Sequence, residues 1–222
     1  KLTKITSLKN DLALALAATS LRIEAPIRGQ SLVGIEIPNS ERANVGMREI
    51  LESDNWNDMK SPLSLCVGRD VAGKPFTVDL GKMPHLLIAG KTGSGKSVGM
   101  NAFLCSLLWK NAPDDLKFIL IGPKRVELKP YDNLPHLLTP VIVEPEKAVS
   151  SLAWCVAEMN RRYKLLASKG VRDIKSLNAK FPEEKEPFIV IVIDELADLM
   201  MAAGKDVEAA ICRIAQMARA VG

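Results

Sequence analysis

The residues best suited to chemistry form a glycine-rich run at 90–97, which reads GKTGSGKS. The run fits GxxxxGK[ST] at every fixed position, a pattern that binds nucleotide phosphates. Its glycines allow a tight loop whose backbone N–H groups converge on phosphate oxygens. Lys96 adds a mobile positive charge for the β- and γ-phosphates, and the Ser97 hydroxyl suits a Mg²⁺ ligand. We expect the nucleotide to be bound by Gly90, Lys91, Thr92, Gly93, Ser94, Gly95, Lys96, Ser97 and Val98.

Two adjacent carboxylates, Asp194 and Glu195, follow the apolar run FIVIVI at 188–193. Ligands of α/β sheets bind at the carboxyl ends of strands, so these acids are candidates for a site. We expect Asp194 to hold Mg²⁺, usually through water, and Glu195 to orient or deprotonate the attacking water. A solvated acidic turn is the common alternative, but the neighbouring phosphate loop favours the functional interpretation. With Lys96 and Glu195 as catalytic residues, the pattern predicts Mg²⁺-dependent hydrolysis of a nucleoside triphosphate.

The segments around these residues alternate between apolar strands and helices, as such a site requires. HLLIAG at 85–90 predicts a strand buried on both faces, and 96–111 predicts a helix that points its positive dipole end at the phosphates. Further strands are expected at 117–122, 138–143 and 187–196, and further helices at 146–170 and 206–222. This alternation indicates a parallel sheet in a three-layer α/β domain. An unrelated α/β fold with a glycine-rich turn is disfavoured because the loop follows a strand and opens a helix.

The N-terminal part predicts a small mixed unit. A helix is expected at 7–19, strands at 21–27 and 30–38, a short helix within 40–53, and a hairpin across 61–84. We place a small α+β domain at 1–60 and the nucleotide-binding α/β domain at 61–222.

The composition is that of a globular protein, with 47% hydrophobic and 25% charged residues. A net charge of +4 is too small to indicate nucleic-acid binding by itself. The cysteines Cys66, Cys105, Cys155 and Cys212 lack zinc spacing, so buried, reduced thiols in the cytoplasm are expected. No apolar run reaches the ~20 residues that cross a bilayer. Because the first residue is Lys, we expect the chain to be part of a longer protein.

Some polar and aromatic residues carry weaker signals. Lys124, Arg125 and Lys129 form a basic cluster that could face a polyanion, although ordinary surface charge is the more common explanation. His85 and His136 each follow Pro, and a structural role near a strand start is preferred to ligand binding. Trp154 and Tyr163 predict core or interface packing rather than stacking on bases.

Several longer segments resemble the motor of the FtsK/SpoIIIE DNA translocases. The resemblance extends from about residue 3 to the end of the chain. It is carried by DLALALAATSLRIEAPIRGQSLVGIEIPN, MPHLLIAGKTGSGKSVGMNAFLCSLL, PHLLTPV, AWCVAEMNRRYKLL, VIVIDELADLMM and RIAQMARAVG.

This resemblance implies a two-part motor, a small α domain followed by a RecA-like P-loop NTPase domain. Such motors form a hexameric ring around double-stranded DNA and pump it with ATP and Mg²⁺ during chromosome segregation at cell division. The motor would lie in the cytoplasm, and the parent protein would be anchored in the bacterial inner membrane. A winged-helix domain would follow, and recombinase or division proteins are possible partners.

A ring ATPase completes its site with an arginine from the neighbouring subunit. Arg213 and Arg219 are the preferred candidates for this arginine, and Arg161 and Arg162 are weaker ones. For each of them alone, a solvated cation on a helix face is the more common explanation.

The chain departs from the family pattern at two places. Family members usually carry Asp after the second strand, whereas this chain has Gly122. Its loss could weaken a contact near the nucleotide or between subunits, or be neutral drift. The family also continues beyond residue 222, so the DNA-contacting loops and the rest of the α/β domain are expected there. Two other functions stay open: a related ring ATPase that moves another cargo in secretion or conjugation, and a nucleotide-binding assembly module without turnover.

Overall fold

The centre of the protein is a parallel pair of strands. The computed structural model describes residues 2–27, 29–41, 43–124 and 126–222. Strand β5 (Leu116–Ile121) pairs with β6 (Phe188–Ile193) in register from Leu116 opposite Phe188 to Ile121 opposite Ile193. Their carboxyl ends therefore lie at the same edge, where Asp194 follows β6.

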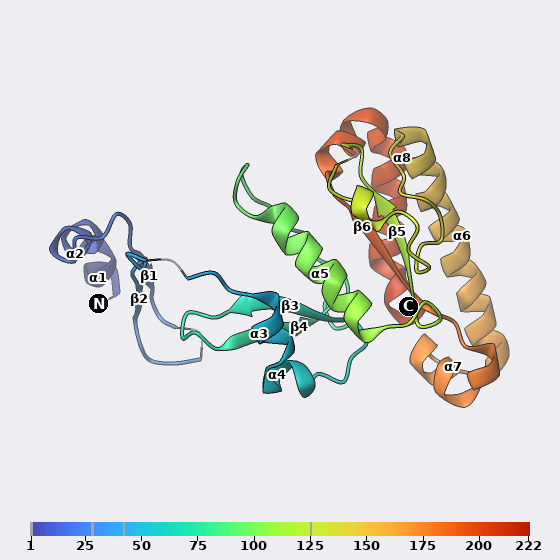
Figure 1. Ribbon diagram of the computed structural model, residues 1–222, viewed down its shortest axis with the longest axis horizontal. Helices are drawn as coiled ribbons and strands as arrows, with labels where there is room; N and C mark the ends of the chain where they lie inside the picture. Colours follow the sequence, from blue (N-terminus) through green and yellow to red (C-terminus); the bar gives the residue numbers. More distant parts are fainter. Residues whose placement is uncertain (1, 28, 42, 125) are drawn as a thin grey trace.

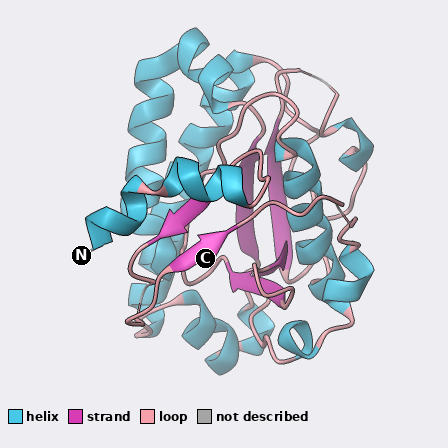
Figure 2. Cartoon of the chain, turned by 90° about the vertical axis from the view of Figure 1, so that its left-hand side faces the viewer, coloured by secondary structure: helices cyan, strands magenta, loops and turns pink. Residues whose placement is uncertain are grey.

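Helices cover both faces of this strand pair, which confirms the predicted α/β class (Figures 1 and 2). Leu116, Phe118 and Leu120 of β5 pack with helix α5 (Lys96–Lys110). The alternate residues Ile119 and Ile121 pack with α6 (Pro145–Lys169) and α8 (Leu196–Met217). A strand buried on both faces needs an apolar residue at nearly every position, and the sequence of β5 supplies this.

A hairpin packs beneath α5. Its strands β3 (Ser64–Arg69) and β4 (Pro75–Asp79) are antiparallel, as predicted. The short helices α3 (Met47–Leu51) and α4 (Asp54–Asn57) bury Trp56 in a core with Cys66 of β3. Lys110 of α5 lies 4.4 Å from the centre of the Trp56 ring. Burial, hydrogen bonds and this cation–π contact thus join residues 47–79 to α5.

The first residues form the far end of the molecule in Figure 1. They contain helices α1 (Leu2–Ser7) and α2 (Lys9–Ala15) and the antiparallel strands β1 (Arg22–Glu24) and β2 (Gly34–Glu36). The predicted helix at 7–19 corresponds to α2, and the two predicted strands to β1 and β2, each with shorter bounds; α1 was not predicted. The expected boundary between residues 60 and 61 stays a prediction.

The long helices end and begin at recognisable residues. Gly170 follows α6 in the left-handed conformation, with φ of +62°, as predicted for a helix C-terminus. Helix α8 begins at Leu196, ten residues earlier than expected, and is interrupted at Ala203 (φ −149°, ψ 43°). The prediction therefore missed the first part of this helix, which lies before the interruption. The remaining elements are α7 (Ile174–Lys180) and the 3₁₀ turns η1 (Lys129–Tyr131), η2 (Pro182–Glu184) and η3 (Ala218–Ala220).

Two predicted strands are wrong in part. Residues 85–90 are not a strand, and Leu87 is 79% exposed. Within the described residues no strand lies beside this segment, so its backbone lacks the partner that a strand requires. Within the described part of the chain, residues 138–143 make one isolated bridge, between Ile142 and Ile121. Pro140 explains the interruption, since proline cannot donate to a ladder.

The expectation of buried, reduced thiols holds for only two of the four cysteines. All four cysteines are free: Cys66 and Cys155 are buried, and Cys105 and Cys212 are exposed. Burial raises the pKa of Cys155 to about 11. Across the described residues, every helix is too short or too polar to cross a membrane.

Candidate active site

The phosphate loop turns into α5 at two glycines with special geometry. Gly95 precedes the helix with φ of +93°, a conformation that side chains with a Cβ rarely adopt. A Cβ at Gly90 would overlap the Ser94 hydroxyl oxygen, so a larger residue there would force the Ser94 side chain to move. The main chain from Gly90 to Gly95 is exposed and leads directly to the first N–H groups of α5. These are the local features that a phosphate-binding loop needs.

Lys96 joins this loop to the two acids that follow β6. Its Nζ donates to the backbone oxygen of Asp194 at 2.9 Å and to Glu195 Oε2 at 3.1 Å. It also lies 3.8 Å from Asp194 Oδ1. Residues almost one hundred positions apart in the sequence thus meet at one edge of the sheet. The predicted association of the phosphate loop with the acidic pair is therefore present in the structure.

Asp194 is fixed by the sheet and largely removed from solvent. Its backbone N–H donates to Ile121 O at 3.0 Å, and the residue is only 8% exposed. Burial raises the pKa of this carboxyl, opposed by the positive charge of Lys96. A buried carboxylate beside a cation and a phosphate loop is a suitable metal ligand.

Glu195 directly precedes α8 and accepts hydrogen bonds from two lysines. Besides Lys96, Lys124 Nζ lies 3.3 Å from Glu195 Oε2. The hydrogen bond from Lys96 is the main cause that lowers the pKa of Glu195, and the hydrogen bond from Lys124 is the second. The hydrogen bond between Lys124 and Glu195 also raises the pKa of Lys124. Glu195 is consequently ionised near neutral pH, as a group that accepts a proton must be.

The residues present fit a nucleoside triphosphate with Mg²⁺. The loop is tightly packed at Gly90, where a Cβ would displace the Ser94 side chain, and Lys96 supplies positive charge. Ser97, at the start of α5, and Asp194 provide the oxygen ligands that Mg²⁺ prefers. Val98 is 73% exposed, so its side chain is free of the core.

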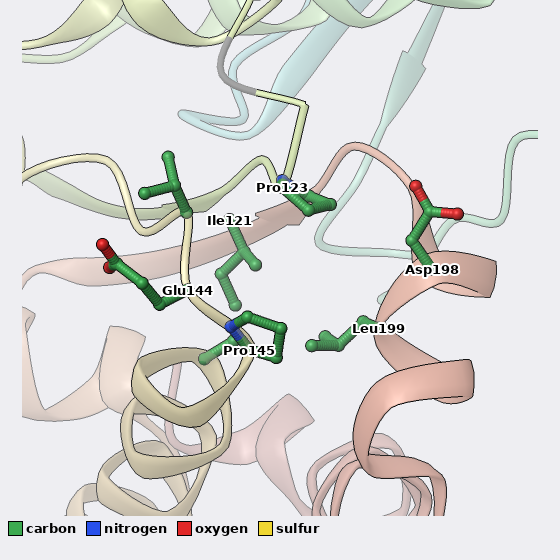
Figure 3. Close-up of a pocket in the computed structure, with 8 residues that line it drawn as sticks. Ile121, Pro123, Glu144, Pro145, Asp198 and Leu199 are labelled. Atoms are coloured by element: carbon green, nitrogen blue, oxygen red, sulfur yellow. The ribbon is translucent and has the colours of Figure 1, made fainter.

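A small apolar cavity lies next to the acids but is not the nucleotide site. Its volume is about 10 Å³, room for a single water. In Figure 3, Leu199 points toward Pro145 and Ile121, whereas the carboxylate of Asp198 points away. The cavity lies where β5, α6 and α8 pack against one another.

A second cavity, of about 350 Å³, borders Gly122. Its lining also includes Leu128, Lys129, Asp132, Val141 and Val143. A Cβ at Gly122 would lie 3.1 Å from Leu128 Cδ1, so Leu128 would have to move by a few tenths of an ångström to admit the family's Asp. The cavity gives Leu128 room for that movement.

The four candidate arginines differ sharply in their surroundings. Arg162 is 3% exposed, and its guanidinium binds Glu158 at 2.8 Å and Val221 O at 2.9 Å. Arg161 is half-exposed and pairs with Glu158 and Glu186, each at 2.7 Å. Both arginines form ion pairs within their own chain. Because Arg162 is also buried, it is not the solvated cation considered from the sequence, and it is poorly placed to act as the trans arginine.

Arg213 and Arg219 are exposed, and within the described residues neither contacts Lys96 or the acids. Their role in a neighbouring site stays a prediction. The basic cluster was interpreted as ordinary surface charge, but Lys124 reaches Glu195, and Lys129 pairs with Asp132 at 2.8 Å. Arg125 lies outside the described residues. The proximity of Lys124 to Glu195 could have been inferred from its position after a strand parallel to β6.

The histidine and aromatic predictions are confirmed in part. His136 is buried, and its Nε2 lies 3.0 Å from Asn111 O, as a structural histidine should. His85 is exposed and precedes no strand. Tyr163 packs in a core and donates to Met217 O at 2.5 Å, whereas Trp154 is 46% exposed, which contradicts core packing.

Comparison with protein families gives two matches that together span most of the sequence. The FtsK/SpoIIIE family profile matches residues 46–222, and the FtsK alpha domain profile matches residues 1–39. The chain belongs to the FtsK/SpoIIIE family.

Curated relatives of this FtsK/SpoIIIE chain are proteins named DNA translocases. It is 54% identical to DNA translocase FtsK of Campylobacter jejuni over 100% of this chain and 24% of that protein. DNA translocase FtsK of Caldanaerobacter subterraneus is 55% identical, with 31% of its length covered. DNA translocase SftA of Bacillus subtilis is 51% identical, with 24% covered. The chain thus spans about a quarter to a third of the length of these relatives.

Solved structures with the same fold are ATPase motor domains. The pCW3 conjugation coupling protein TcpA, a monomer with ATPγS, matches with a TM-score of 0.66 and 28% identity over 99% of this chain and 62% of that chain. The cytoplasmic domain of the Type VII secretion ATPase EccC of Thermomonospora curvata matches with a TM-score of 0.65 and 25% identity, over 81% of this chain and 24% of that one. The P-loop ATPase fold of this family member agrees with the fold predicted from the sequence.

Proposed function

We propose that the protein is an ATP-driven translocase of double-stranded DNA that acts in chromosome segregation at cell division. The observation that carries the proposal is the contact of Lys96 with Asp194 and Glu195, in a chain 54% identical to a DNA translocase. The first supports nucleotide hydrolysis, and the second supports DNA as the cargo.

In the proposed site, the loop from Gly90 to Ser97 binds the phosphates through backbone N–H groups, and Lys96 exchanges its carboxylate partners for phosphate oxygens. Ser97 and Asp194 hold Mg²⁺, which neutralises charge on the phosphates. Glu195 lies at the edge of this site and accepts the proton of the attacking water. Arg213 or Arg219 of a neighbouring subunit adds positive charge near the γ-phosphate.

The assembly belongs to the same proposal. A hexameric ring around DNA would place the arginines of one subunit beside the phosphate loop of the next. The motor would work in the cytoplasm as part of a longer protein anchored in the inner membrane. Division or recombinase proteins would be its partners there.

The proposal is tested by measuring ATP hydrolysis by the full-length protein with and without linear duplex DNA. We expect DNA to raise the rate severalfold and Lys96→Ala to abolish it, because the variant loses the charge that binds the β- and γ-phosphates. Lys164→Ala, which removes an exposed lysine of α6, is the matched control and should behave as the wild type.

Two other results would favour other functions. A rate indifferent to DNA would support a motor for another cargo, a possibility favoured by the 28% identity to a conjugation coupling protein. Binding of ATP without turnover would support an assembly module.

A further inference from the structure

Lys124 is a second cation at the acidic edge of the sheet. It lies two residues beyond Gly122, in the loop that leaves β5, whereas Lys96 belongs to the phosphate loop. Its Nζ lies 3.3 Å from Glu195 Oε2 and 3.9 Å from Asp198 Oδ2. Lys124 therefore links the acid that follows β6 to the first turn of α8.

Both lysines bind the same oxygen of Glu195. Lys96 Nζ lies 3.1 Å from Oε2, and Lys124 Nζ lies 3.3 Å from it. Bound phosphate attracts Lys96 away, because several anionic oxygens compete with one carboxylate. Lys124 comes from a different element and has Asp198 as a second anchor. It can hold Glu195 when Lys96 has left.

We propose that Lys124 is a positioning residue for Glu195: anchored by Asp198, it keeps the carboxylate at the edge of the site after Lys96 has turned to phosphate. The inference rests on the proposed ATPase function and adds a residue that the phosphate-loop and acid patterns do not contain. A free lysine side chain can adopt many rotamers, and contacts with two carboxylates restrict those of Lys124. The same contacts restrict the positions of the two carboxylates relative to one another.

The test compares Lys124→Ala, Lys124→Arg and Lys129→Ala in the naturally expressed protein. Misplaced reacting groups lower the chemical rate, so we expect Lys124→Ala to reduce kcat about tenfold and to change KM for ATP less than about twofold. Arginine keeps the charge and the reach, so Lys124→Arg should restore most of kcat. Lys129, in the same loop but paired with Asp132, is the matched control and should keep the wild-type kcat.

Two further measurements separate positioning from a merely structural role. The contact of Lys124 is exposed, so its loss should lower the melting temperature by less than about 4 °C. If Lys124 acts through Glu195, adding Lys124→Ala to Glu195→Gln should reduce kcat no further.

Three results would overturn the inference. The first is an unchanged kcat in Lys124→Ala. The second is a manyfold rise in KM with normal kcat, which would make Lys124 a nucleotide contact. The third is failure of Lys124→Arg to restore the rate. In each case wild-type hydrolysis stimulated by DNA would leave the proposed function intact. Absence of that hydrolysis in the wild type would instead contradict the proposed function itself.

Discussion

At the scale of single residues, the site depends on how two neighbouring carboxyls are differentiated. Asp194 is buried, and burial raises its pKa, whereas hydrogen bonds from Lys96 and Lys124 lower the pKa of Glu195. Under the proposed function, adjacent positions would thus supply a protected metal ligand and an accessible ionised base. Opposite shifts of paired carboxyls are a common way to divide such roles.

Replacing Glu195 by Gln tests this division of roles. We expect hydrolysis to fall about 10²- to 10⁴-fold, because glutamine cannot accept a proton, while ATP binding persists through the phosphate loop. Rates from steady-state assays and affinities from equilibrium binding check the two halves. Glu208→Gln, on the exposed side of α8, is the control. Equal loss of binding and hydrolysis would assign Glu195 to nucleotide binding instead.

At the scale of elements, α6 carries two adjacent arginines that share one partner. Arg161 and Arg162 both bind Glu158, but the side chain of Arg161 is 50% exposed and that of Arg162 only 3%. Arg162 also donates to Val221 O and so connects α6 to the turn that follows α8. The same residue type thus contributes differently according to its burial.

Urea unfolding of Arg162→Ala and Arg161→Ala should show this difference. Removing Arg162 leaves the buried end of the network without its cation, so we expect the unfolding free energy to fall by about 3–5 kcal/mol. Arg161→Ala loses a half-exposed pair and should cost less than about 1 kcal/mol. Equal costs would show that Glu158, rather than burial, decides the stability of the network.

Elements with a strong local signal were predictable from the sequence. The helices that became α5 and α6 have long apolar faces, and Gly170 marks the end of α6. The strands β5 and β6 are continuous apolar runs. Residues 85–90 are a similar apolar run, but within the described residues no strand lies beside them. Composition therefore could not reveal that they stay exposed. Pro140, in contrast, is visible in the sequence and disfavours a continuous strand at 138–143.

The site was predictable where a motif fixes spacing and less so where side chains meet through the fold. GKTGSGKS identified Lys96, and an acidic pair after a strand identified Asp194 and Glu195, which lie in contact with it. Lys124 was taken for surface charge, because only the pairing of β5 with β6 brings it to its partner 71 positions away in the sequence. Arg162 was misjudged for a similar reason, since its burial depends on residues 221 and 222.

At the scale of the whole molecule, the proposed ring predicts that an exposed arginine of one subunit completes the site of the next. Lys96→Ala and Arg213→Ala should each reduce hydrolysis, the arginine change by about 10³-fold. If Arg213 acts in trans, mixing the two variants should restore part of the activity, because one subunit supplies the intact loop and its neighbour the intact arginine. The rate of the mixture, measured after subunit exchange, checks this. Arg219→Ala provides the parallel arm.

No recovery with either arginine would remove both from the active site. Recovery with only one of them would identify the residue that completes the neighbour's site. Because both arginines are exposed at the end of α8 and in η3, neither change should disturb the core.

The distribution of thiols offers a means to observe such a machine at work. Cys105 lies on the helix that starts at the phosphate loop, and Cys212 on the helix that starts beside Glu195; both face solvent, while Cys66 and Cys155 are enclosed. Maleimide dyes will therefore attach to the two accessible sulfurs first. A fluorescent pair introduced in this way, without any engineered cysteine, would report changes in separation between these two helices during each turnover.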